Sequence, residues 1–192
     1  MRWRPHGADA QRVAVVGATG SGKTTLVRQL LERAQRVVAY DPKGLGEHGL
    51  PAGDAATGER VAVLRDPTTE PDAEVDAVCR EVWARGNVLL VLDDAMVLSG
   101  TKPPHWLQVV VTMGRSRGIG VLSVVQRPRT VPRILLTEAE HVIAFRVRHP
   151  DDAELLARLA SRRLAAAAAL PRYDYVWCDL EADEWRRGVT VP

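Results

Sequence analysis

Near the start of the chain stands Gly17-Ala18-Thr19-Gly20-Ser21-Gly22-Lys23-Thr24, the stretch that decides the fold. It fits the pattern GxxxxGK[ST] at every position, and it lies between an apolar run at 12–17 and a stretch of helical spacing. The glycines let the backbone turn tightly, so that several N–H groups point at phosphate oxygens at the positive end of the following helix. The sequence therefore predicts a phosphate-binding loop (P-loop), rather than a glycine-rich turn with a chance lysine.

The side chains of this loop predict its ligand. Lys23 is expected to reach the terminal phosphates, Thr24 to coordinate magnesium, and Thr25 to support the α-phosphate. We therefore expect ATP and Mg²⁺ as cofactors. The expected nucleotide-binding residues are Gly17, Ala18, Thr19, Gly20, Ser21, Gly22, Lys23, Thr24 and Thr25.

Two acidic residues follow the apolar run at 88–92. Asp93 and Asp94 follow this run directly, at the end of a predicted buried strand. Asp93 is the expected partner of Thr24 in the magnesium shell, and Asp94 is placed to orient and polarise the attacking water. Two carboxylates can also merely solvate a strand end, but their position downstream of a P-loop favours hydrolysis.

Apolar strand patterns alternate with helical patterns along the chain. This alternation predicts an α/β fold with a mostly parallel sheet, helices on both faces, and ligands at the carboxyl ends of the strands. The expected strands are 12–17, 36–41, 61–64, 87–94, 118–126, 141–147 and 173–180. The expected helices are 23–34, 71–86, 107–116, 130–139 and 151–170, the last including an alanine run.

Size and composition narrow the class of protein. A chain of 192 residues that is 46% hydrophobic suits a single domain, here 1–192, with a loose lead-in at 1–11 and a closing helix and strand at 151–192. The net charge of +2 excludes a polycation that coats nucleic acid. Cys79 and Cys178 have no metal or redox spacing and are expected to be buried apolar residues. The sequence predicts no transmembrane segment, and we expect a cytoplasmic location.

Further motifs follow the P-loop in a defined order. They are Asp-Pro-Lys-Gly at 41–44, the acidic strand end, Gly-Arg-Ser-Arg-Gly-Ile at 114–119, and Gln-Arg-Pro at 126–128. In this order and spacing, residues 12–148 resemble the FtsK/HerA superfamily of DNA-pumping ATPases. The resemblance implies a RecA-like P-loop NTPase of the ASCE type, in which the Gln-bearing strand lies between the P-loop strand and the acidic strand.

The resemblance also implies roles for single residues. Gln126 would sense the γ-phosphate, and Arg115 would enter the active site of a neighbouring subunit as an arginine finger, with Arg117 as the alternative. Arg146 aligns with a polar position of the family but receives no role. In one respect the chain departs from the family, because Asp94 stands where members usually have glutamate. This difference affects the expected rate, not ATP binding.

The absence of further domains favours the small members of the family, which include genome-packaging ATPases of tailless, membrane-containing icosahedral viruses. The resemblance then implies an ATP-driven double-stranded DNA translocase that works as a hexameric ring, with capsid or portal-vertex proteins as partners, in the host cytoplasm or the virion. Another DNA pump of the family, for conjugation or segregation, is the alternative within it.

Two basic regions are candidates for DNA contact. One is the loop 99–106, with Lys102 and His105, and the other contains Arg127, Arg129 and Arg133. A solvated or subunit-contacting surface explains either region about equally well.

Three other classes of protein remain open on the residues alone. A small-molecule P-loop kinase has a similar length, although it does not require paired aspartates and a Gln-Arg-Pro strand end. An ATP-gated assembly protein would bind nucleotide with little turnover. A regulatory GTPase is disfavoured, because no Asn-Lys-x-Asp segment follows the acidic strand.

Overall fold

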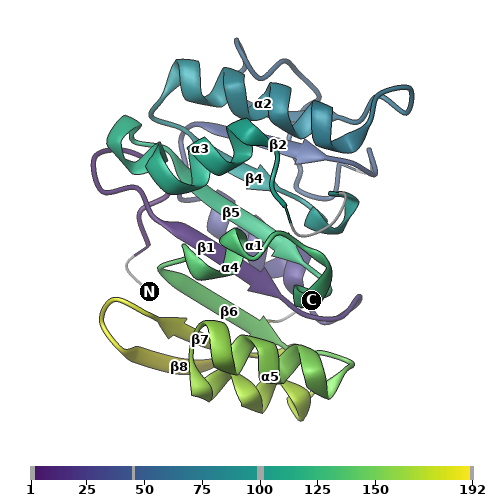
Figure 1. The fold of residues 1–192 in the computed structure, drawn as a ribbon, viewed down its shortest axis with the longest axis vertical. Coiled ribbons are helices and arrows are strands. Elements are labelled where there is room, and N and C mark those ends of the chain that lie inside the picture. Colours follow the sequence, from purple (N-terminus) through teal and green to yellow (C-terminus); the bar gives the residue numbers. More distant parts are fainter. Residues whose placement is uncertain (1–2, 45, 99–101, 191–192) are drawn as a thin grey trace.

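The computed structural model describes residues 3–44, 46–98 and 102–190 of the chain. Its strands form one eight-stranded sheet in the order β3-β2-β4-β5-β1-β6-β7-β8 (Figure 1). The six strands from β3 to β6 in this order are parallel, and β7 and β8 are antiparallel to their neighbours. The strands are β1 (Arg12–Val16), β2 (Val37–Asp41), β3 (Arg60–Leu64), β4 (Leu89–Leu92), β5 (Gly120–Val125), β6 (His141–Phe145), β7 (Asp174–Asp179) and β8 (Glu184–Val189).

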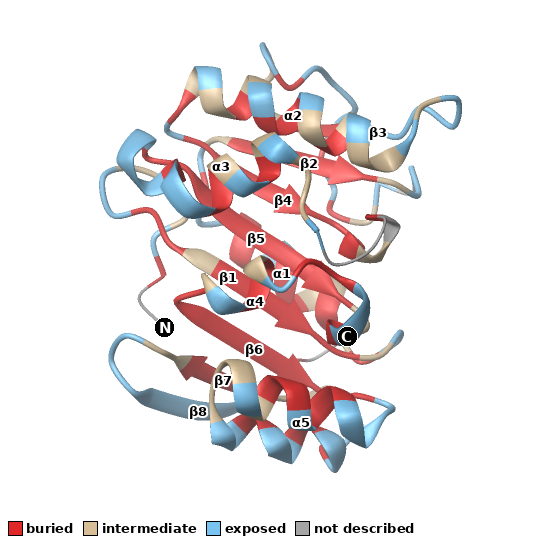
Figure 2. Cartoon of the chain, viewed as in Figure 1, coloured by how far each residue is buried: buried red, intermediate tan, exposed pale blue. Residues whose placement is uncertain are grey.

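Helices cover both faces of this sheet, as its pattern of buried strands requires. On one face α1 packs against alternate strand residues such as Val13 and Val15, and on the other four helices pack against the intervening residues such as Ala14 and Val16. Both layers of side chains are buried, so the central strands are buried on both sides (Figure 2). The helices are α1 (Lys23–Leu31), α2 (Pro71–Arg85), α3 (His105–Met113), α4 (Ile134–Thr137) and α5 (Pro150–Leu159).

The strand order confirms the fold class predicted from the sequence. β5 lies between β1, which precedes the P-loop, and β4, which precedes the two aspartates. Because the three strands are parallel, the loops that follow them emerge at the same edge of the sheet. The fold therefore brings residues from 17–24, 93–94 and 126 to one place.

Two features of the C-terminal part differ from the prediction. The prediction of a single helix at 151–170 is wrong, because α5 ends at Leu159 and the alanine run lies in a 3₁₀ helix, η4 (Arg162–Ala168). The buried residues of this segment, Leu164, Ala167 and Leu170, recur every three residues, which matches the three-residue turn of a 3₁₀ helix. Strand β8 was not predicted, because most of its residues are exposed and carry no apolar pattern.

Other expectations from composition can be compared with the described residues. Cys79 and Cys178 are both buried and unpaired. Among the helices in the described ranges, none has the length and apolar character needed to cross a bilayer.

Candidate active site

The P-loop connects β1 to α1 and has a backbone that only glycine fits closely. Gly20 and Gly22 adopt left-handed conformations, with φ of 73° and 105°. A Cβ on Gly17 would lie 2.6 Å from the Cβ of Phe145, and a Cβ on Gly22 would overlap the hydroxyl of Thr190. The Ser21 hydroxyl is buried without a hydrogen-bond partner among the described residues. A tight cradle with an unsatisfied polar atom fits a phosphate ligand.

Lys23 lies folded back onto this loop. Its Nζ donates hydrogen bonds to the backbone oxygens of Gly17 and Ala18 at 2.8 and 2.9 Å. Burial lowers the pKa of Lys23 to about 8, and the negative charges of Asp94 and Asp93 partly oppose this shift. Lys23 therefore shares one electrostatic neighbourhood with Asp93, the predicted magnesium ligand, and Asp94, the predicted catalytic carboxylate.

Asp93 and Asp94 follow β4 and are both buried. Asp94 adopts a left-handed backbone with φ of 48°, which turns the chain sharply at the strand end. Its Oδ2 accepts a hydrogen bond from Gln126 Nε2 at 3.1 Å, and the Thr19 hydroxyl donates to Gln126 Oε1 at 2.8 Å. The other oxygen, Asp94 Oδ1, has no hydrogen-bond partner among the described residues. A chain of hydrogen bonds thus joins the P-loop, Gln126 and Asp94, and leaves one buried oxygen of Asp94 without a partner among the described residues.

The loop after β2 also enters the site, which sequence reasoning did not foresee. Lys43 Nζ lies 2.7 Å from Asp94 Oδ2, and His48 Nε2 lies 3.1 Å from Asp93 Oδ2. The Thr24 hydroxyl donates to Glu47 Oε2 at 3.3 Å. The Asp-Pro-Lys-Gly motif at 41–44 marked this loop only as part of a family pattern, and it assigned no role to these side chains.

Three arginines surround the outer side of the P-loop. Arg146, Arg148 and Arg172 line a cavity of about 210 Å³ together with residues of the loop itself. Arg172 Nε donates to the Gly20 oxygen at 3.2 Å, and its guanidinium stacks 4.7 Å from the Tyr173 ring centroid. The cavity adds positive charge beside the expected phosphate position. The sequence motifs assigned no role to Arg148 or Arg172.

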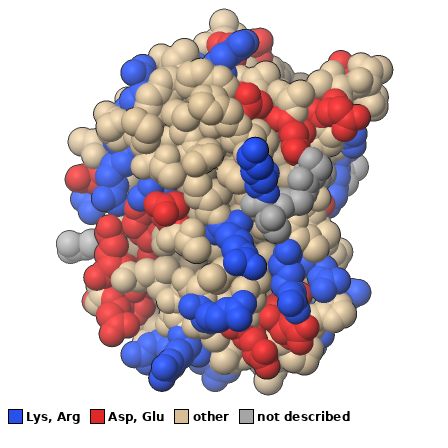
Figure 3. Space-filling model, viewed as in Figure 1, with Lys and Arg blue, Asp and Glu red and all other residues tan. Residues whose placement is uncertain are grey.

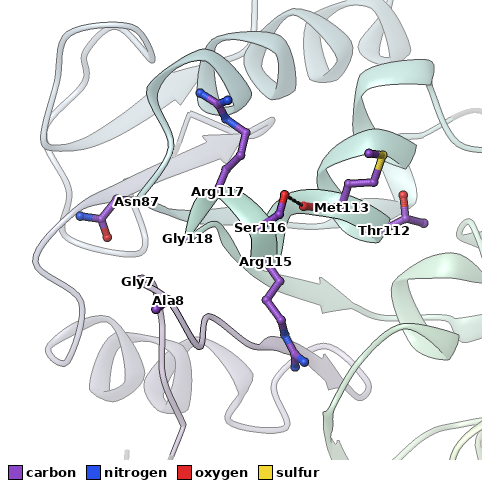
Figure 4. A pocket seen from close by; sticks show the side chains of 9 residues that line it. All are labelled: Gly7, Ala8, Asn87, Thr112, Met113, Arg115, Ser116, Arg117 and Gly118. Carbon is purple, nitrogen blue, oxygen red and sulfur yellow. Dashed lines mark hydrogen bonds between the residues drawn. The ribbon is translucent and has the colours of Figure 1, made fainter.

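Arg115 lies elsewhere, at the amino ends of the strands. It lines a cavity of about 830 Å³ with Arg117 and neighbouring residues (Figure 4). Arg115 Nη2 lies 2.7 Å from Glu140 and 3.4 Å from Glu181, while Arg117 stacks 5.1 Å from the Trp83 ring centroid. This cavity is larger than those at the P-loop, but it has no phosphate cradle or paired aspartates. Neither arginine belongs to the site that contains Lys23.

The predicted DNA-contact regions are only partly described. Residues 99–101 of the loop 99–106 lie outside the described residues, whereas Lys102 and His105 are described and exposed. Arg127 lies 3.5 Å from the buried Asp152, and Arg129 pairs with Asp151 at 2.5 Å. Basic side chains, with acidic ones among them, gather on the face that carries α4 and α5 (Figure 3). Arg127 and Arg129 are thus partly engaged within the chain.

Two known proteins are similar to this chain in sequence, and one of the matches extends over nearly the whole chain. The DNA packaging ATPase P9 of Enterobacteria phage PRD1 is 24% identical over 205 residues, a match that covers 96% of this chain and 88% of P9. The DNA double-strand break repair helicase HerA of Sulfurisphaera tokodaii is 30% identical over 77 residues, which cover 38% of this chain and 16% of HerA. The chain is therefore similar to P-loop ATPases of the FtsK/HerA type. No protein-family profile matches it.

The fold of the chain also agrees with a solved viral structure. The genome packaging NTPase B204 from Sulfolobus turreted icosahedral virus 2, in complex with AMPPCP, superposes with a TM-score of 0.80 at 17% identity. The superposition covers 97% of this chain and 100% of B204. The similarity therefore includes the C-terminal hairpin β7–β8 as well as the parallel core.

Proposed function

We propose that this chain is an ATP-driven double-stranded DNA translocase that packages a viral genome. The observation that carries the proposal is the bonded chain from Thr19 through Gln126 to Asp94, beside Lys23, at one edge of the sheet. The match to P9, a DNA packaging ATPase, extends over 96% of the chain and supports packaging over other uses of the same ATPase fold.

Each side chain of the site has a task in hydrolysis. The backbone amides of 17–24 and the amine of Lys23 bind the phosphates, and Thr24 and Asp93 would hold magnesium, which neutralises phosphate charge when bound. Asp94 orients the attacking water through its free oxygen, and Gln126 links the state of Asp94 to the P-loop through Thr19. Thr25 supports the α-phosphate. Lys23 exchanges its bonds to Gly17 and Ala18 for bonds to phosphate.

In this proposal, ATP hydrolysis depends on the assembly of several subunits. Arg115, or Arg117 in its place, supplies positive charge to the transition state of a neighbouring subunit, so that hydrolysis requires a ring. We propose a hexamer that docks on capsid or portal-vertex proteins at the site of virion assembly. Arg115 lies away from its own P-loop, which supports action in trans over action in cis.

We assign the contact with DNA to two groups of basic residues. Lys102 and His105 are exposed, and Arg127, Arg129 and Arg133 lie close to the ends of β5 and α4. Cyclic movement of such side chains, each bound to DNA phosphates, would convert hydrolysis into movement of DNA.

A DNA-dependence assay tests the proposal. Double-stranded DNA should stimulate ATP hydrolysis severalfold, and the stimulation should fall as salt rises, because bound phosphates release counterions. The Lys23→Ala protein is the control for contaminating ATPases. If DNA had no effect while a nucleoside or sugar consumed ATP stoichiometrically, the chain would be a kinase and the proposal would be wrong.

A further inference from the structure

The loop that follows β2 is fixed in place by a buried carboxylate. Asp41 is 2% exposed, and its Oδ1 accepts hydrogen bonds from the backbone N–H groups of Lys43 and Gly44 at 3.1 and 3.0 Å. Its Oδ2 accepts a third from Gly46 at 2.9 Å. An aspartate that binds the backbone ahead of it holds a turn in one conformation. The residues that follow are therefore presented to the carboxyl edge of the sheet.

Three side chains of this loop contact three different groups of the hydrolytic site. Glu47 accepts from the Thr24 hydroxyl, His48 lies against Asp93, and Lys43 pairs with Asp94. The side chain of His48 is 3% exposed, and Arg28 Nε donates to the backbone oxygen of Glu47. The loop is thus anchored on both sides of Glu47.

We propose that Glu47 is a second carboxylate of the magnesium site, beside Asp93 and the Thr24 hydroxyl. The inference rests on the proposed ATPase function. Its main support is the distance of 3.3 Å between Glu47 Oε2 and the Thr24 hydroxyl. Adjacent oxygen ligands of octahedral magnesium, each at about 2.1 Å from the ion, lie about 3 Å apart. Magnesium also keeps several waters, so a carboxylate at this distance can bind either the ion or one of its waters.

The charge around Glu47 supports a cation at this place. Within the described residues, no basic side chain lies within ion-pair distance of the Glu47 carboxylate. Its carboxylate accepts a hydrogen bond from the neutral Thr24 hydroxyl, and the charges of Lys23 and Lys43 interact with it from further away. A partly buried carboxylate without an ion-pair partner gains most from a bound cation.

Glu47 and Asp94 have separate tasks at this edge of the sheet. Asp94 Oδ2 is already held by Lys43 and Gln126, which leaves one oxygen for the water. The longer side chain of Glu47 reaches the same edge of the sheet from β2 rather than β4. Glu47 and Asp94 thus reach this edge from the loops that follow two different strands, β2 and β4.

A magnesium titration of nucleotide binding tests this role. Binding of a fluorescent ATP analogue is measured against Mg²⁺ concentration for the wild type and for Glu47→Gln, which keeps shape and removes charge. The Mg²⁺ concentration at half-maximal binding should rise about tenfold, since loss of one group around a metal typically costs 10- to 100-fold in affinity. Binding in EDTA should not change. Glu47→Asp, which keeps the charge, should recover part of the Mg²⁺ affinity.

The test has a matched control variant and a defined outcome that would contradict the role of Glu47. Glu32→Gln removes an exposed carboxylate at the end of α1 and should behave as the wild type. If Glu47→Gln had an unchanged Mg²⁺ requirement, or bound Mg²⁺-nucleotide more tightly, Glu47 would only occupy the site until nucleotide arrives, and the inference would be wrong. A wild type that bound no nucleotide at any Mg²⁺ concentration would overturn the ATPase function as well.

Discussion

The carboxyl ends and the amino ends of the parallel strands form two edges of the sheet, and these two edges hold their charged residues in different ways. At the carboxyl edge, the side chains come from loops, and Asp94 Oδ1 and Ser21 Oγ are buried without partners in the described chain. At the amino edge, the buried Glu140 binds both Arg12 and Arg115, and Glu181 adds a further contact to Arg115. Arg12 reaches Glu140 through its backbone N–H at 2.6 Å as well as through its guanidinium.

This difference indicates that the carboxyl edge is a ligand-binding site and that the amino edge is a surface for contact with a neighbouring subunit. The carboxyl edge has polar atoms that a ligand can satisfy, as a preformed nucleotide site should. At the amino edge Arg115 is already paired with Glu140 and Glu181, so it must leave Glu140 before it can act on anything else. An arginine held in this way suits a group that is used only when a neighbouring subunit is in place.

The largest expected effect is at the carboxyl edge. Lys23→Ala should abolish both nucleotide binding and turnover, because the amine neutralises the terminal phosphates and loss of one preorganised donor alone costs about 10²- to 10³-fold in rate. Equilibrium binding of an ATP analogue and steady-state hydrolysis measure the two effects. Normal nucleotide affinity in this variant would remove the P-loop from the proposal.

The second effect tests whether the amino edge acts on a neighbour. Arg115→Ala should keep ATP binding and lose about 10³-fold in turnover, the scale of an arginine finger. Mixing Arg115→Ala protein with Lys23→Ala protein should restore some hydrolysis, since mixed rings combine an intact P-loop with an intact finger. Arg117→Ala, assayed in the same way, identifies which arginine acts. Absence of rescue at every ratio, for both arginines, would contradict action in trans.

A third and smaller effect concerns stability at the amino edge. Glu140→Ala should lower the free energy of unfolding by about 3 kcal/mol, because Arg12 is left partly buried without its carboxylate. Glu181→Ala is the matched control, since it removes an exposed carboxylate from Arg115 and should cost less than about 1 kcal/mol. Denaturant unfolding measures both. Equal losses would show that the buried network adds nothing beyond a surface ion pair.

The smallest effect is a pH dependence of the same network. Burial alone would raise the pKa of Glu140, but the hydrogen bonds and charge of Arg12 hold it below its ordinary value of 4.5. A carboxyl whose pKa is lowered on folding stabilises the protein above the unfolded pKa, and this contribution is lost as pH falls through the folded value. The stability difference between wild type and Glu140→Gln should therefore be largest at neutral pH and shrink below about pH 4.5. A difference that stayed constant with pH would contradict a charged Glu140.

The sequence by itself determined the parallel core and the P-loop at its carboxyl edge. Buried parallel strands read as continuous apolar runs, and the P-loop pattern depends on local backbone geometry, so both are visible without tertiary contacts. The strand order was expected from family resemblance rather than from the pattern, because periodicity does not specify which strands are neighbours. Strand β8 and the 3₁₀ helix η4 escaped prediction, since an exposed strand and a three-residue repeat in an alanine run lack the usual periodic signals.

Only the tertiary structure decided which side chains meet. Glu47 and Thr24 are 23 residues apart, and Arg115 and Glu140 are 25 apart, and nothing local in the sequence links either pair. Their contacts arise because sheet pairing and the burial of two apolar layers bring together the helices and loops that carry them. Hydrophobic patterning fixes which face of an element is buried, whereas contacts between loops depend on the final positions of all the strands beneath them.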